Sequence, residues 1–111
     1  MILHITTRGA WSEALNRGAY MADSLATEGF IHCSTPSQIA WVANQRFRGR
    51  TDLILLHIDP TRLDAEVVYE NLEGGEQLFP HVYGPIPIPA VVEVTPFLPS
   101  GDGSFTLSLD P

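Results

Sequence analysis

The segment DLILLHI at residues 52–58 limits the possible folds of this chain more than any other, because it is almost wholly apolar. A strand with no polar face is typical of a central position in a sheet that is covered on both faces. Asp59 and Pro60 follow at once and end the strand, since the residue before a proline is restricted in conformation. We therefore expect a sheet with packed cover on two sides.

The remaining sequence predicts short elements of both kinds. Strands are expected at residues 2–6, 29–34, 66–70, 90–97 and 104–109, with helices at 8–17 and 36–47 and a helical turn at 23–28. Thr35 is expected to cap the second long helix, with Pro36 at its first position and Gln38 completing a capping box. Helices come early and strands late, which indicates an α+β fold with a largely antiparallel sheet.

Proline placement restricts the segment LFPHVYGPIPIP at residues 78–89. Pro80, Pro85, Pro87 and Pro89 exclude a helix or a central strand, because proline lacks the N–H that both structures use. We expect a stiff, extended segment on the surface or across a cleft.

Size and composition indicate one domain spanning residues 1–111. Hydrophobic residues make up 44% and charged residues 17%, which argues against disorder. Cys33 is the single cysteine and can form no internal disulfide, so we expect a cytoplasmic protein. The first residues do not resemble a signal peptide, and no apolar run approaches the roughly 20 residues of a membrane span, so no membrane partner is expected.

The charge of the chain limits the classes of partner that it can bind. Acidic residues number 13 and basic residues 6, giving a net charge of -7, so binding to long nucleic acid is not expected. All the basic residues are arginines, which excludes a lysine Schiff base. Arg46, Arg48 and Arg50 form a cluster that either holds a phosphate or simply places cations at a helix end.

The histidines are the main candidates for chemistry. Ile2, His4 and Thr6 alternate along one strand, and Phe30, His32 and Ser34 along another, so neighbouring strands would bring two imidazoles and two hydroxyls to one wall. A shared site and separate structural roles were both compatible with this pattern. His57 reads as structural.

His81 and Tyr83 lie among prolines and a glycine, in a loop that either presents them to a ligand or packs on its own aromatic residues. Metal-ligand spacings such as Cys-x-x-Cys are missing, so no metal is expected. Cys33 alternates with His32 and is expected to be a small core residue rather than a nucleophile.

Three segments carry a family resemblance: LHIT at 3–6, EGFIHCST at 28–35 and LFPHVYGP at 78–85. Together they resemble the bacterial domain-of-unknown-function 952 family, over nearly the whole chain from Ile2 to about Val94. That family brings no established activity. It is in turn similar in fold to the ADP-ribosyltransferase group, including the RNA 2′-phosphotransferases, which also have a His-x-Thr strand and a His-x-Ser strand.

The resemblance implies an ADP-ribosyltransferase-like fold that binds NAD, or an ADP-ribose-like nucleotide, in a cleft between small sheets. It implies cleavage of the nicotinamide–ribose bond through an oxocarbenium-like state. The implied catalytic residues are His32 and Glu70, with Glu93 as the less favoured glutamate, and Arg8 or the arginine cluster if phosphate is involved. The implied ligand-binding residues are His4, Thr6, Ser34, Thr35, His81 and Tyr83, with Tyr20 as an alternative to Tyr83 for stacking on nicotinamide.

Three kinds of function are compatible with this sequence. The first is an NAD-dependent transferase or hydrolase. The second is a non-catalytic nucleotide-binding module, because no glutamate is unambiguously catalytic. The third is an interaction protein that uses the proline-rich residues 79–89.

Overall fold

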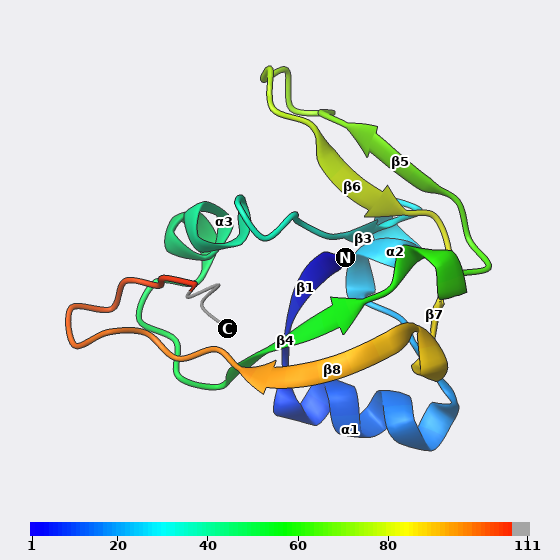
Figure 1. Cartoon of the computed structure of the whole chain (residues 1–111), viewed down its shortest axis with the longest axis horizontal. Helices are drawn as coiled ribbons and strands as arrows, with labels where there is room; N and C mark the ends of the chain where they lie inside the picture. Colours follow the sequence, from blue (N-terminus) through cyan, green and yellow to red (C-terminus); the bar gives the residue numbers. More distant parts are fainter. Residues whose placement is uncertain (108–111) are drawn as a thin grey trace.

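The apolar segment is the central strand of the first sheet. The computed structural model describes residues 1–107, in which β4 (Leu53–Ile58) lies between β1 (Ile2–Thr7) and β8 (Val91–Pro96), antiparallel to both (Figure 1). Alternate residues of β4 enter two different cores, which confirms the predicted cover on both faces. The residues toward the first core are Ile54, Leu56 and Ile58, and those toward the second are Leu53 and Leu55.

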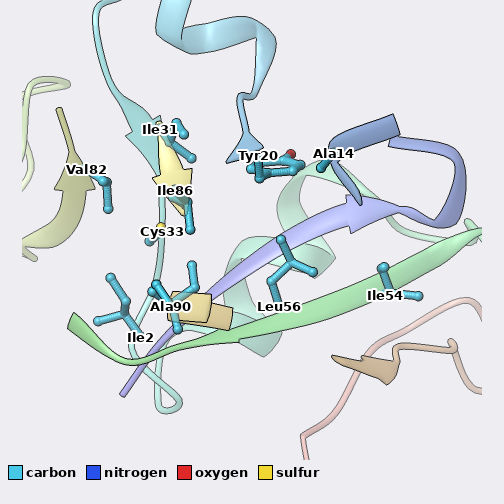
Figure 2. Packing of buried hydrophobic residues seen from close by; sticks show 11 residues of the cluster. Ile2, Ala14, Tyr20, Ile31, Cys33, Ile54, Leu56, Val82, Ile86 and Ala90 are labelled. Atoms are coloured by element: carbon cyan, nitrogen blue, oxygen red, sulfur yellow. The ribbon is translucent and has the colours of Figure 1, made fainter. Parts of the chain in front are cut away.

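The first core fills the space between this sheet and α1 (Arg8–Arg17), β2 (Ala19–Tyr20) and β7 (Ile86–Pro87). Figure 2 shows side chains from β1, β3, β4, β6 and η2 (Ile88–Ala90) converging there. Cys33 is one of them and is buried, which confirms the prediction of a small core residue. Burial raises the pKa of its thiol, because the thiolate would lose its hydration.

The second core lies on the other face, under α3 (Ile39–Arg46) and the segment from Phe97 to Leu107. A strand was predicted at 104–109, but residues 104–107 form no strand, and 108–109 lie outside the described residues. The side chain of Asn44 explains the difference. It donates to the Phe105 carbonyl oxygen at 3.0 Å and accepts from the Phe105 N–H at 2.7 Å, so it replaces a partner strand.

A second three-stranded sheet, in the order β3 (Ile31–His32), β6 (Phe79–Val82) and β5 (Val67–Glu70), carries the remaining long pairings. Residues 31–34 connect it to the first sheet, since Leu3 and Ser34 exchange two main-chain hydrogen bonds of 2.8 Å. The β5–β6 hairpin extends away from the first sheet at the top of Figure 1. Short elements α2 (Asp23–Thr27) and η1 (Pro60–Arg62) complete the order.

The prediction that proline excludes a central strand at 78–89 is wrong for β6, which lies between β3 and β5. The Pro80 carbonyl oxygen accepts from the Cys33 N–H at 3.0 Å, and in a strand the N and C=O of one residue point to the same side. The missing N–H of Pro80 therefore faces β3 near its end and removes no bond to β5. Much of the segment is buried rather than superficial, including Pro80, His81, Val82 and Ile86.

Helix ends agree with their sequence signals in part. Thr7 Oγ1 caps α1 by accepting from the Ala10 N–H at 3.1 Å, and Gly18 ends this helix with a φ of 93°. The second long helix begins at Ile39 instead of Pro36, after a turn at 35–38. The Gln38 side chain accepts from the Thr35 N–H at 2.9 Å, as a capping box predicts, but its amide also donates to the Leu78 carbonyl oxygen at 2.7 Å.

The described residues form an α+β fold with small antiparallel sheets and three α-helices, as predicted. Within residues 1–107, no helix has the length and apolar character needed to cross a membrane.

Candidate functional site

A cleft of about 800 Å³ lies on the α3 side of the first sheet, between that helix and the β5–β6 hairpin. This volume is in the range of small-molecule sites. Five residues predicted from the sequence line it: His4, His32, Ser34, Glu70 and His81. The sheet connection at 31–34 forms the inner wall, and the loop at 71–77 borders the cleft on the hairpin side.

Glu70, His81 and Tyr83 form one hydrogen-bonded group. His81 Nδ1 donates to Glu70 Oε1 at 2.9 Å, and the Tyr83 hydroxyl donates to the same oxygen. These bonds, that from Tyr83 first, hold the pKa of Glu70 below its usual value, so the carboxylate is ionised at neutral pH. In return, the bond to this carboxylate raises the pKa of Tyr83. Both donors contact Oε1, which leaves Oε2 without a protein donor among residues 1–107.

His32 lies beside this group and has a carboxylate of its own. Its Nε2 donates to Glu28 Oε2 at 2.9 Å, and this bond lowers the pKa of Glu28. The His32 and His81 ring centroids are 5.3 Å apart, nearly perpendicular at 77°. Phe30 is buried next to both, stacked on His81 at 4.1 Å and edge-on to His32 at 4.8 Å. The cleft wall thus carries two imidazoles, each oriented by a carboxylate.

His4 also borders the cleft, but both nitrogens of its ring are engaged in a buried hydrogen-bond network with His32 and Tyr20. Its Nδ1 is 2.5 Å from the His32 carbonyl oxygen and its Nε2 is 2.7 Å from the Tyr20 hydroxyl, which in turn is 3.0 Å from Thr6 Oγ1. Burial lowers the pKa of His4 to about 4, so the ring is neutral at neutral pH. A neutral ring has one N–H, and the carbonyl requires it at Nδ1, so Tyr20 donates to Nε2 and accepts from Thr6.

Of the two alternatives left open by the sequence, separate roles for the His4 and His32 rings agree better with these hydrogen bonds, and strand register is the reason. Leu3 pairs directly with Ser34, and directly paired residues point to the same face. His32 and Ser34 consequently share the face of Leu3, whereas His4 points to the first core. A shift of one residue would have exchanged these faces.

The other predicted residues lie in different places. Thr6 and Tyr20 are buried around His4, so the Tyr20 ring has no open face toward the cleft. Thr35 lies in the turn before α3, where its hydroxyl is 3.1 Å from that of Ser37. Glu93 is exposed on β8, as expected for a residue that faces solvent.

The arginine cluster does not form one anion site. Arg46 pairs with Glu73 at 3.1 Å, Arg50 with Asp52 at 2.5 Å, and Arg48 Nη2 donates to the Asp102 carbonyl oxygen at 3.1 Å. Each arginine has a different acidic neighbour, which favours the interpretation as solvated charges near a helix end.

Several residues of the site were missed from the sequence. The His32–Glu28 pair has the spacing i, i+4 within EGFIHCST. Residues 28–32 leave a helix and enter a strand, so the helical rule that pairs side chains at this spacing does not apply. The alternation placed Phe30 on the face of His32, but Phe30 was not selected as a site residue. Trp41 and Phe79 also line the cleft, and their contact joins elements distant in the sequence. Among residues 1–107, no three metal-ligating side chains gather in one place.

Comparison with known proteins gives the family. The family described as "Protein of unknown function (DUF952)" matches residues 5–94. The chain belongs to this family. A crystal structure of protein CC0527 from Caulobacter crescentus is similar at 30% identity and a TM-score of 0.84, over 96% of this chain and 93% of that one. The solution NMR structure of CC0527 gives 29% identity and a TM-score of 0.79, over 98% and 97%. The search of curated proteins found no match.

The family match confirms the resemblance drawn from the three sequence segments. The relation to the ADP-ribosyltransferase group stays a prediction.

Proposed function

We propose that this DUF952 protein binds NAD, or an ADP-ribose-like nucleotide, in the cleft and cleaves the bond between nicotinamide and ribose. The observation that carries the proposal is the pair of carboxylate-oriented imidazoles, His32 with Glu28 and His81 with Glu70, side by side on the cleft wall. Imidazole and carboxylate groups held in this way are typical of sites for proton transfer and charge stabilisation.

The charge of the cleft supports a ligand whose reacting end is positive. Glu28 and Glu70 face the imidazole pair, and both are held in their ionised form by hydrogen bonds. The nicotinamide ring of NAD is a cation, and positive charge moves to the ribose as the bond breaks. An ionised carboxylate near that ribose stabilises the transition state more than the neutral product.

Glu70 is assigned to this role because of its free oxygen. His81 and Tyr83 fix the carboxylate through Oε1, so Oε2 is oriented without being used. When the glycosidic bond breaks, its electron pair goes to the nicotinamide nitrogen, and Glu70 Oε2 stabilises the cationic C1′ of the ribose. His81 and Tyr83 are positioning residues for this carboxylate, and of the two only His81 lines the cleft and can contact the ligand there.

His32 is assigned to the second half of the reaction. Donation of its Nε2 hydrogen to Glu28 leaves Nδ1 as the acceptor of the neutral ring. Nδ1 takes the proton from the water or acceptor hydroxyl that adds to C1′. Ser34 lies on the same face and lines the wall beside it, whereas His4 holds the His32 main chain from the other side and Thr6 supports His4 through Tyr20.

The test is release of nicotinamide from NAD by the purified protein, followed with ligand-induced change in melting temperature. We expect release by the wild type and its loss in Glu70→Gln, with stabilisation by NAD retained. Glu93→Gln is the matched control, because Glu93 is exposed and does not line the cleft, and this variant should keep full activity. Absence of both nicotinamide release and stabilisation by millimolar NAD would refute the proposal.

A non-catalytic nucleotide-binding module is the second candidate. This candidate is favoured by the two hydrogen bonds that Glu70 already accepts. They engage part of the negative charge of the carboxylate, so less of it is available to stabilise a ligand. This candidate predicts stabilisation by NAD without release of nicotinamide.

A further inference from the structure

The outer half of the cleft contains an aromatic surface that the imidazole pair does not use. Trp41 on α3 and Phe79 on β6 both line the cleft, with ring centroids 6.3 Å apart and planes inclined by 23°. The two rings belong to separate elements, α3 and β6, that both border the cleft.

Trp41 is unusual for its size, because 57% of the residue is exposed. Its position on α3 explains this exposure, because the buried face of the helix is formed by Ile39 and Ala43. Phe79 is half-buried and stacks beside the indole, which is itself part of the cleft lining. A large apolar ring held open in a concave site, and fixed by a neighbour, is suited to stacking with a planar ligand.

Polar groups beside the indole add directional contacts. Gln45 is exposed, lines the cleft and follows Trp41 by one helical turn, so its amide offers a donor and an acceptor on the same side of α3. Arg46 is the one arginine that lines the cleft in the described part of the chain. Its ion pair with Glu73 is exposed on both sides, so a phosphate can take the place of Glu73 with little penalty.

We propose that Trp41 and Phe79 form the subsite for the purine base of a nucleotide, with Gln45 at the base edge and Arg46 at a phosphate. This inference rests on the proposed function and deepens it: the base end of the ligand lies between α3 and the hairpin, while the ribose that reacts lies at His32 and Glu70. The cleft therefore recognises an adenine nucleotide from both ends.

The experiment measures binding of adenosine 5′-monophosphate, which has the base and a phosphate but no bond to cleave. In Trp11→Phe, Trp41 is the remaining tryptophan, and its fluorescence should be quenched on titration with this nucleotide and with ADP-ribose. Nicotinamide mononucleotide, which lacks the purine, should quench far less. Calorimetry on Trp41→Leu should show binding of adenosine 5′-monophosphate weakened by about tenfold or more, as expected for loss of one stacked base.

Tyr69→Leu is the matched control, because Tyr69 is also an exposed aromatic residue, at 51%, but does not line the cleft. It should bind like the wild type. Trp41→Phe should recover most of the affinity, since a smaller ring can still stack.

The outcomes separate the two proposals. If adenosine 5′-monophosphate binds at Trp41 but NAD is not cleaved, the subsite stands and the proposed reaction fails. If NAD is cleaved but Trp41→Leu leaves its KM unchanged, the reaction stands and the subsite is refuted. Absence of binding of the nucleotide at millimolar concentration, or equal binding by the wild type and Trp41→Leu, also refutes the subsite.

Discussion

His4 and His81 are almost equally buried, at 8% and 5% exposure, yet their surroundings assign them opposite tasks. His4 contacts a carbonyl and a hydroxyl, both uncharged, on the side of the first core. His81 contacts an ionised carboxylate on a cleft wall. Burial therefore does not distinguish a structural histidine from a candidate functional one. The charge of the hydrogen-bond partner distinguishes them.

The two regions meet at His32, whose main chain belongs to one and whose ring belongs to the other. Its carbonyl oxygen accepts from His4, and its Nε2 donates to Glu28. The buried hydrogen-bond network thus fixes the strand that presents the cleft group. If this division of tasks is right, changes on the His4 side alter stability, and changes on the Glu70 side alter chemistry while leaving stability nearly unchanged.

The largest effect is expected for His4→Ala. The substitution leaves a cavity and removes the buried partners of Tyr20 and the His32 carbonyl, which should lower the free energy of unfolding by about 3 kcal/mol. Urea denaturation measures this loss. His57→Ala is the control, because His57 makes a single hydrogen bond of 2.8 Å to Thr95 and is half-buried, so about 1 kcal/mol is expected. Equal losses in the two variants would contradict the buried hydrogen-bond network.

A dependence of stability on pH follows from the same group. The pKa of His4 is 6.5 in an unfolded chain and about 4 in the fold, because the buried ring resists protonation. Between these values the unfolded state binds the extra proton, so stability is full above pH 6.5 and falls as the pH is lowered toward 4. The total loss from this residue is about 3 kcal/mol.

The matched comparison for the range between pH 6.5 and pH 4 is the variant His4→Gln, whose side chain does not titrate. Its unfolding free energy, measured by urea denaturation at several pH values, should fall less steeply below pH 6.5 than that of the wild type. Parallel pH profiles would show that His4 is protonated equally in both states, and the neutral assignment would then fail.

A smaller effect is expected for Tyr20→Phe. The variant keeps the ring in the first core but removes the hydroxyl between His4 and Thr6, leaving His4 Nε2 without its donor. The expected loss of unfolding free energy is about 1–2 kcal/mol. Tyr69→Phe removes an exposed hydroxyl and should change the unfolding free energy by less than about 0.5 kcal/mol. If both variants lose equally little unfolding free energy, Tyr20 is not part of a buried hydrogen-bond network with His4 and Thr6.

The difference between the His4 network and the cleft shows which structural features a local sequence pattern can predict and which it cannot. The alternation in β1, the wholly apolar run of β4 and the stop of α1 at Gly18 all depend on neighbouring residues, and each was predicted. The pairing of Leu3 with Ser34 depends on two segments separated by about thirty positions, and either register satisfies the alternation of each strand. The sequence therefore indicated which residues alternate, but not that His4 and His32 face opposite ways.

The same limit applies to the candidate site. His32, Glu70, His81 and Tyr83 were each selected by residue type, but their convergence depends on β6 being central, which the proline rule had excluded. That rule holds for a proline whose N–H is needed, and Pro80 turns its nitrogen to the side where pairing with β3 ends. Trp41 could not be selected from the sequence, because its contact with Phe79 joins two elements that are distant along the chain.

The smallest effect on stability is expected for Glu70→Gln, on the cleft side of the comparison. Glu70 is near the surface, so the free energy of unfolding should change by no more than about 0.5 kcal/mol. The pKa of Tyr83 should nevertheless fall toward its ordinary value of 10.0, because the negative charge that opposes loss of the phenolic proton is gone. Ultraviolet absorbance of tyrosinate, with Tyr83→Phe subtracted to isolate the residue, measures the shift. Glu93→Gln should leave the pKa of Tyr83 unchanged. If the pKa of Tyr83 does not fall in Glu70→Gln, the carboxylate and the phenol are not coupled. The basis for an oriented Glu70 would then be removed.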